Sequence, residues 1–156
     1  MPYVSFHDYF PKIAERETRT ITVLENSSWD LPPAHYSLLE MYCDEPDCDC
    51  RRVFFCVVSS LTKQVEAVIA YGWESPEFYA KWMGDDDPEI IDELKGPILN
   101  LTSPQSEIAP LILDMVEKVV LQDQAYIQRV KTHYWMFRHR IDTNTKQKTK
   151  RKKKKV

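Results

Sequence analysis

The chain has 156 residues, 43% hydrophobic and 29% charged, which is typical of a single globular domain with its own hydrophobic core. It has three glycines and neither the G-x-G-x-x-G nor the G-x-x-x-x-G-K-S/T pattern, which argues against a nucleotide-binding enzyme. No signal peptide is evident, and no apolar run approaches the roughly 20 residues that span a membrane. We therefore expect a cytoplasmic protein with reduced thiols and no membrane partner.

The formal net charge of −3 conceals an uneven distribution of charge. Residues 146–156 contain eight cations and no acid, which leaves 13 cations and 24 acids, a charge of −11, for the rest of the chain. Such a run of like charges is typical of a disordered segment or an interaction tail. The expected organisation is one α+β domain over residues 1–141 and a disordered basic tail over residues 142–156.

The N-terminal half predicts a short helix followed by strands. Aromatic residues recur at helical spacing over residues 5–16, although a proline lies inside this segment. Four β-branched or apolar runs predict a small antiparallel sheet of about four strands, over residues 18–25, 35–43, 52–60 and 65–73. The third run is almost entirely apolar, so we expect a central strand covered on both faces. The short connections between the runs favour an antiparallel meander.

The C-terminal half predicts helices. Serine, aspartate and proline at the starts, and glycine at the ends, predict short helices from residue 75 to about 83 and from residue 88 to about 96. Residues 97–105 are expected to be irregular. Apolar stripes at helical spacing predict two longer helices, over residues 106–121 and 123–141.

All four cysteines lie within residues 43–56. Cys43 ends one predicted strand, and Cys48 and Cys50 lie on the turn before the next, so antiparallel pairing brings three thiols together at a hairpin tip. Thiolate is the preferred ligand of structural zinc, which takes four ligands in a tetrahedron. The C-x4-C-x-C spacing therefore predicts a zinc site at these three cysteines. Cys56 lies roughly 20 Å further along an extended run and is expected to be a buried free thiol.

The fourth ligand and the role of the cluster stay open at this point. The ligand could be an aspartate of the loop, water, or one of the histidines, which are His7, His35, His133 and His139. The alternatives to zinc are a reduced thiol cluster and a redox switch in which Cys43 forms a disulfide with Cys48 or Cys50. A small metalloenzyme is a further alternative, but the chain lacks the H-E-x-x-H and P-C-x-x-C patterns. The leading prediction is a non-enzymatic, metal-binding interaction or scaffold module with an unknown protein partner.

Two groups of cations bear on possible partners. Arg51 and Arg52 follow the cysteines, and we expect them to pair with the acids of the loop, with contact to an anionic partner as the alternative. The last predicted helix and the tail give a second function hypothesis, a nucleic-acid-associated protein that binds phosphate backbones. The residues of this candidate interface are Arg129, Lys131, Arg138, Arg140, Lys150, Arg151, Lys152 and Lys153. A solubilising tail, or one folded back on the acidic body, is the alternative, because the tail has no aromatic residues for base stacking.

Two segments of the chain resemble a family of uncharacterised bacterial proteins. They are residues 42–52, YCDEPDCDCRR, and residues 126–134, YIQRVKTHY, within a similarity that extends from about Tyr36 to Arg140. Some members of that family carry a C-terminal SEC-C zinc motif. In this chain a lysine-rich tail stands in its place, so the function of that motif does not transfer. The resemblance implies metal binding and no known activity.

Overall fold

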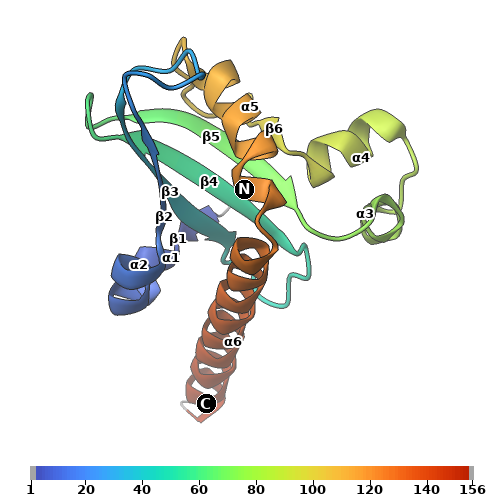
Figure 1. The fold of residues 1–156 in the computed structure, drawn as a ribbon. Coiled ribbons are helices and arrows are strands. Elements are labelled where there is room, and N and C mark those ends of the chain that lie inside the picture. Colours follow the sequence, from blue (N-terminus) through green and yellow to red (C-terminus); the bar gives the residue numbers. More distant parts are fainter. Residues whose placement is uncertain (1–2, 155–156) are drawn as a thin grey trace.

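The computed structural model describes residues 3–154, which form a six-stranded antiparallel sheet with two helices packed across one face (Figure 1). The strands are β1 (Tyr3–Ser5), β2 (Arg19–Val23), β3 (Ala34–Cys43), β4 (Arg52–Ser59), β5 (Val65–Gly72) and β6 (Ile98–Leu99). Their order is β1-β3-β4-β5-β6, and β2 pairs with β3 on the same edge as β1. The α+β class and the four predicted strands are confirmed, and the short strands β1 and β6 are additional.

The β3-β4-β5 meander forms the centre of the sheet. Tyr36 pairs with Ser59 and Met41 with Phe54, so the segment between β3 and β4 is the loop of a hairpin. The strand β1 pairs with the end of β3, where Tyr3 lies opposite Cys43. The predicted cysteine-bearing hairpin is therefore present, and β1 lies beside its base.

The first helical segment differs from the prediction. In place of one helix over residues 5–16, the chain forms α1 (Phe6–Tyr9) and α2 (Pro11–Glu17). Pro11 lies in the first turn of α2, where its missing N–H has no intrahelical partner, so it begins a helix instead of continuing one.

The later helices begin close to the predicted positions, and all but the last also end close to them. They are α3 (Pro76–Met83), α4 (Pro88–Lys95), α5 (Ala109–Lys118), the 3₁₀ turn η1 (Val120–Gln122) and α6 (Gln124–Lys154). The side chain of Ser75 accepts a hydrogen bond from the N–H of Phe78, and Asp87 accepts one from Glu89. Gly84 ends α3 in the left-handed conformation that glycine adopts without strain. No helix within residues 3–154 is long and apolar enough to cross a membrane.

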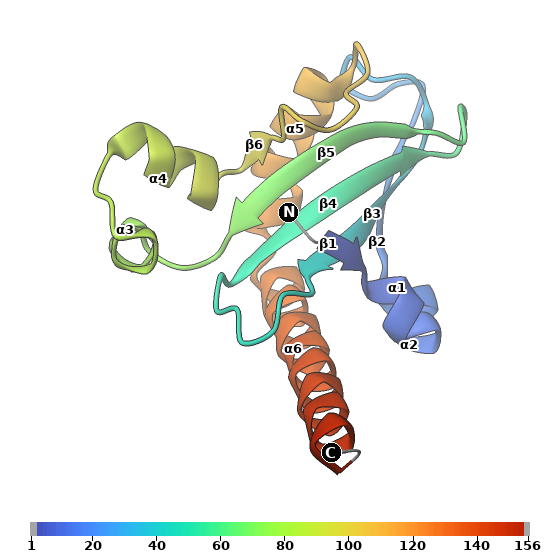
Figure 2. The same cartoon turned by 180° about the vertical axis from the view of Figure 1, so that it is seen from behind.

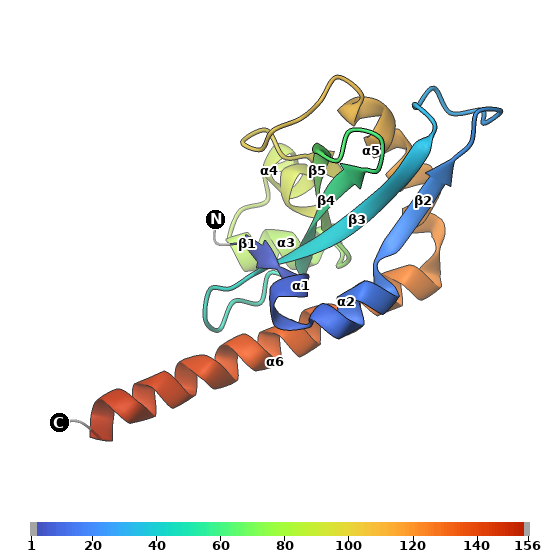
Figure 3. The ribbon, with the colours of Figure 1, turned by 90° about the vertical axis from the view of Figure 1, so that its left-hand side faces the viewer.

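The last helix is longer than predicted. It continues past residue 141 to Lys154, for 31 residues or about 46 Å at 1.5 Å per residue. Residues 142–154, which we expected to be disordered, are therefore helical, and Figure 3 shows this part of α6 projecting away from the sheet. The cations of its last turn suit the negative end of the helix dipole. Residues 155 and 156 of the predicted tail lie outside the described part of the chain.

The main core lies between the sheet and the helices α5 and α6 (Figure 1). Leu38 of β3 and Phe55 of β4 are fully buried there, and Ile112 of α5 is equally buried on the helical side. The apolar stripe predicted for the last helix is buried as expected, at Tyr126, Val130, Tyr134, Phe137 and Ile141.

The opposite face of the sheet is not covered by α5 or α6 (Figure 2). A smaller core lies on this face, formed by Phe54, Val68 and Ala70, with the ring of Tyr3 stacked on Phe54 at 4.0 Å between centroids. The strand β4 is therefore central and buried on both faces, as predicted. Cys56 packs on this second face as a free thiol, half-buried where we expected full burial, and burial raises its pKa.

Candidate metal centre

Three thiols meet at the tip of the β3-β4 hairpin. Cys43 is the last residue of β3, Cys50 comes shortly before β4, and Cys48 lies in the loop between them. The thiol of Cys48 is close enough to the other two for each contact to change its pKa. Cys43 and Cys50 are each 2% exposed, Cys48 is half-buried, and no disulfide joins them. The sequence therefore identified correctly which three cysteines share the hairpin tip and which one does not.

Burial determines the protonation of these thiols. It raises the pKa of Cys43 to about 11, with a smaller contribution in the same direction from the neighbouring Cys48. The pKa of Cys48 is raised in the same way, by burial and then by the charge of Cys50. Both thiols are therefore protonated near neutral pH. A metal ion that binds here must displace their protons, since thiolate is the form that ligates metals.

The backbone of the cysteine loop bends at two left-handed residues. Asp47 has φ of 59° and Arg51 has φ of 49°, in a region that non-glycine residues rarely occupy. The N–H of Asp47 donates to Oδ1 of Asp142 at 2.9 Å, and the N–H of Arg51 donates to Oη of Tyr134 at 3.1 Å. Both acceptors belong to α6, so this helix holds the loop on either side of its last two cysteines.

Arg138 of α6 fastens the base of the same loop. It donates to the carbonyl oxygen of Cys43 at 2.5 Å, to that of Glu45 at 2.7 Å and to the carboxylate of Asp142 at 2.8 Å. The residue is 3% exposed, and its buried Nε has no hydrogen-bond partner within the described part of the chain. We expected Arg138 on a basic surface for nucleic acid. That expectation is corrected, because its guanidinium is enclosed and already occupied inside the protein.

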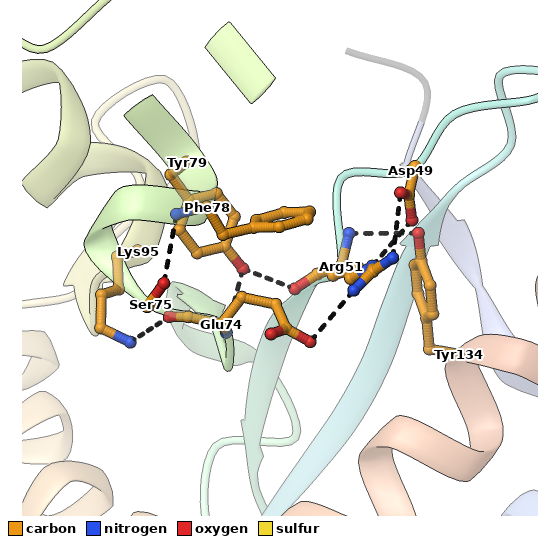
Figure 4. A network of polar contacts seen from close by, with 8 residues as sticks. All are labelled: Asp49, Arg51, Glu74, Ser75, Phe78, Tyr79, Lys95 and Tyr134. Atoms are coloured by element: carbon orange, nitrogen blue, oxygen red, sulfur yellow. Dashed lines mark hydrogen bonds and ion pairs between the residues drawn. The ribbon is translucent and has the colours of Figure 1, made fainter. Parts of the chain in front are cut away.

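Arg51 binds the loop to the neighbouring elements (Figure 4). Its guanidinium donates to both carboxylate oxygens of Asp49, at 2.9 and 3.2 Å, and lies 3.5 Å from a carboxylate oxygen of Glu74. Its carbonyl oxygen accepts a hydrogen bond of 2.8 Å from Tyr79, and its guanidinium lies over the ring of Phe78. The expected pairing of Arg51 with an acid of the loop is thus present.

Arg52 behaves differently from its neighbour. We expected it to pair with the acids of the loop as well, but its side chain points to the opposite face of the sheet. There it donates to the carbonyl oxygen of Leu94 at 2.7 Å and to Oη of Tyr3 at 3.2 Å. Arg52 is the first residue of β4, and strand residues alternate between the two faces of a sheet, so it shares a face with Phe54; Arg51 precedes the strand in the left-handed conformation and stays with the loop.

The donor set and its surroundings fit a zinc ion. Zn²⁺ with three thiolates carries a net charge of −1, and Arg138 provides a positive charge that acts on both Cys43 and Cys48. The buried Nε of Arg138 also has no hydrogen-bond acceptor among the described residues. Within residues 3–154, no three His, Cys, Asp or Glu side chains already have the arrangement of a metal site. Zinc binding therefore requires the thiols to rotate toward a common point.

The structure reduces the candidates for a fourth ligand. Both ring nitrogens of His133 are engaged by glutamates, and His35 lies near the far end of β3, where its Nδ1 is 2.8 Å from a threonine hydroxyl. Asp49 is held by Arg51. His7 and His139 are exposed residues of α1 and α6. The remaining acids of the loop are close to the thiols in sequence, and they and water remain as candidates for the fourth ligand.

The sequence did not predict a buried network of polar side chains that joins α6 to β3 and α2. His133, 1% exposed, lies 2.7 Å from Oε1 of Glu40 through Nδ1 and 2.8 Å from Oε2 of Glu17 through Nε2. Tyr42 donates to the same oxygen of Glu40 at 2.5 Å. Burial acts to lower the pKa of His133, but the hydrogen bonds and charges of the two glutamates outweigh it and raise the pKa. The signal in the sequence was Glu40 itself, which lies on the inward-facing positions of β3 between Leu38 and Tyr42.

The other predicted basic residues lie along α6. Arg129 donates to the carbonyl oxygen of Glu17, Arg140 lies over the ring of Phe10 at 4.6 Å, and Lys131 is half-buried. The lysines and arginine of the C-terminal turns are exposed on the projecting part of the helix, at Lys150, Arg151, Lys152 and Lys153. Apart from Arg138, the predicted cations are therefore distributed along α6, and all of them except the half-buried Lys131 are exposed.

Comparison with known proteins gives no family for this chain. It matches no family model, no curated protein sequence and no solved structure. The resemblance to uncharacterised bacterial proteins stays a prediction, and the function must be argued from the residues of the site.

Proposed function

We propose that this protein is a non-enzymatic module that binds zinc through Cys43, Cys48 and Cys50 at the tip of the β3-β4 hairpin. The observation that carries the proposal is the convergence of three thiols on a loop whose backbone is anchored by α6. Zinc bound there supplies a cross-link without redox chemistry. The protein supplies the ligands and, through Arg138, a positive charge that balances the thiolates.

The anchoring of the loop supports metal binding. A metal site is stronger when its ligands are positioned in advance, because the ordering of the loop then does not oppose binding. Here Arg138 holds the carbonyl oxygens of Cys43 and Glu45, while Tyr134 and Asp142 hold two N–H groups of the loop. The backbone of the loop is therefore already ordered around its cysteines.

The protonation of the thiols favours a structural metal over a redox switch. Reactive and redox-sensing cysteines have lowered pKa values in exposed, electropositive surroundings. The pKa values of Cys43 and Cys48 are instead raised by burial. A buried, protonated thiol reacts slowly with oxidants, whereas a zinc ion can still displace its proton.

An aromatic surface beside the loop supports the interaction half of the proposal. Trp135 of α6 is 49% exposed, and its ring lies 5.5 Å from the guanidinium carbon of Arg51. Tryptophan and arginine are enriched among the residues that dominate protein interfaces. The ordered loop and this tryptophan together form the surface that we assign to a protein partner.

Elemental analysis tests the proposal. Untagged protein purified under reducing conditions is expected to contain about one zinc per chain. A Cys48→Ser/Cys50→Ser variant should contain none and melt at a lower temperature, since binding to the folded state adds stability. Cys56→Ser is the matched control, because Cys56 is a free thiol on the other face of the sheet, and it should keep the metal. The proposal is contradicted if the purified wild-type protein contains no metal and has the same melting temperature as the double variant.

A second candidate function, binding to nucleic acid, is favoured by one observation. The cations at residues 150–153 are exposed on a helix that projects from the body (Figure 3). Such a helix can contact phosphate groups, with strong dependence on salt. A chain truncated after residue 145 should then lose most of its affinity for a polyanion column at low salt. Unchanged retention of the truncated chain excludes the helix end as the binding element.

A further inference from the structure

A cavity of about 700 Å³ lies on the face of the sheet opposite α5 and α6. Its floor consists of Phe54 of β4 with Val68 and Ala70 of β5, and α4 and β6 supply Leu94 and Ile98 at its sides. The volume falls within the range of about 300–1,000 Å³ that is usual for small-molecule sites. The lining is mostly apolar and includes one basic residue, Arg52, and one acidic residue. The zinc proposal does not involve this cavity.

Arg52 is an enclosed cation with only neutral partners in the protein. It is 4% exposed, and it donates to the carbonyl oxygens of Leu94 and Glu93 and to Oη of Tyr3. None of the ion pairs among residues 3–154 includes Arg52. A guanidinium has five N–H donors, and these contacts use three of them. Because a buried charge without a counter-ion is unfavourable, the remaining donors favour an anion at this wall.

The apolar floor extends from Arg52 along the strands. Arg52 lies opposite Gly72 at one end of β5, and the carbonyl oxygen of Val68 accepts a hydrogen bond from Asn100 further along that strand. The four residue steps from Val68 to Gly72 correspond to about 13 Å at 3.3 Å per residue. Leu101, which is 88% exposed, forms part of the rim. The site is therefore elongated, with a cation at one end and an apolar surface along its length.

We propose that this cavity binds an amphipathic carboxylate of the size of a medium-chain fatty acid. The carboxylate accepts hydrogen bonds from Arg52, and the alkyl chain lies along Phe54, Val68 and Ala70. The acidic lining residue, Glu93, repels the same carboxylate weakly, because its own side chain is exposed to solvent.

Calorimetric titration tests whether the site selects a carboxylate headgroup. The full chain is titrated with decanoate, decanol and decylamine in low-salt buffer, below their micelle concentrations. Decanoate is expected to bind at least about tenfold more tightly than the other two, because only the carboxylate can pair with the guanidinium. The amide NMR signals that move most should belong to residues 52–54, 68–70 and 98–102. Equal binding of the three compounds, or no binding of decanoate, overturns the proposal. NMR signal changes confined to the lysines of α6 overturn it as well.

Variants test the location independently of the headgroup series. Ala70→Leu fills the floor without removing a polar group and should weaken decanoate binding at least about tenfold. Glu93→Gln removes a like charge and should strengthen binding about two- to fivefold at low salt. Arg52→Met should bind decanoate and decanol equally, provided that its circular dichroism matches wild type. Lys152→Gln on the exposed end of α6 is the control and should change nothing. Unaltered decanoate affinity in Ala70→Leu contradicts the assigned site.

Discussion

Arg138 is predicted to be the main anchor of the cysteine loop. Replacing it by methionine keeps an unbranched stem of similar length and removes hydrogen bonds to Cys43, Glu45 and Asp142. The carbonyl oxygen of Cys43 then loses a buried charged donor. Breaking a buried, charge-assisted contact of this kind costs about 3–5 kcal/mol of unfolding free energy. That is a large part of the roughly 5–15 kcal/mol available to a domain, so Arg138→Met should be folded but clearly destabilised.

Urea unfolding with linear extrapolation measures this cost directly. The matched control is Arg140→Met on the same helix, where an exposed guanidinium lies over the ring of Phe10 and contributes under about 1 kcal/mol. Arg138→Met should also hold zinc less tightly than Arg140→Met, because the loop is no longer positioned. Equal unfolding free energies of the two variants refute the idea that Arg138 positions the loop.

Three further predictions concern the rest of the fold. The pKa of His133 is raised in the folded state, so the stability that protonated His133 contributes is complete below the ordinary histidine pKa and is lost as pH rises through the raised value. Urea unfolding at pH values on either side of that range should show a larger loss of stability for the wild-type protein than for His133→Gln. Gly72→Ala places a Cβ 2.2 Å from Oη of Tyr79 and should cost about 1–3 kcal/mol in urea unfolding, with partial recovery when Tyr79→Phe is added. Ile112→Ala removes a fully buried side chain and should cost about 2–5 kcal/mol by the same measurement, and a cost below about 1 kcal/mol argues against its packing.

The sequence predicted the elements whose signal is local. The strands β2 to β5 have alternating or continuous apolar runs, and the helices α3 and α4 have a proline in the first turn and a capping side chain. The strands β1 and β6 gave no such signal, because they have three and two residues and exist only through pairing with β3 and β5. Pro11 weakens the prediction of a single helix over residues 5–16, and in the structure it lies in the first turn of a second helix.

The sequence also predicted which thiols meet, because the ends of adjacent antiparallel strands meet at a hairpin. It did not predict what surrounds them. Arg138 continues the row of every fourth residue that includes Val130 and Tyr134, so its position on the buried side of α6 was visible in the spacing. Its charge suggested a surface position instead, since arginine is rarely buried without partners. The partners of Arg138 are two backbone carbonyl oxygens and Asp142, and their positions depend on the tertiary fold.

Cobalt(II) titration of the reduced protein is the most direct test of the central claim that Cys43, Cys48 and Cys50 together bind one metal ion. Cobalt reports thiolate ligation through a charge-transfer absorption band, and zinc should displace it. The account predicts a band that saturates at about one equivalent, decreases in each of the three single Cys→Ser variants and is unchanged in Cys56→Ser. A band that is absent from the wild-type protein, or that is equally strong after any of the three replacements, contradicts the account.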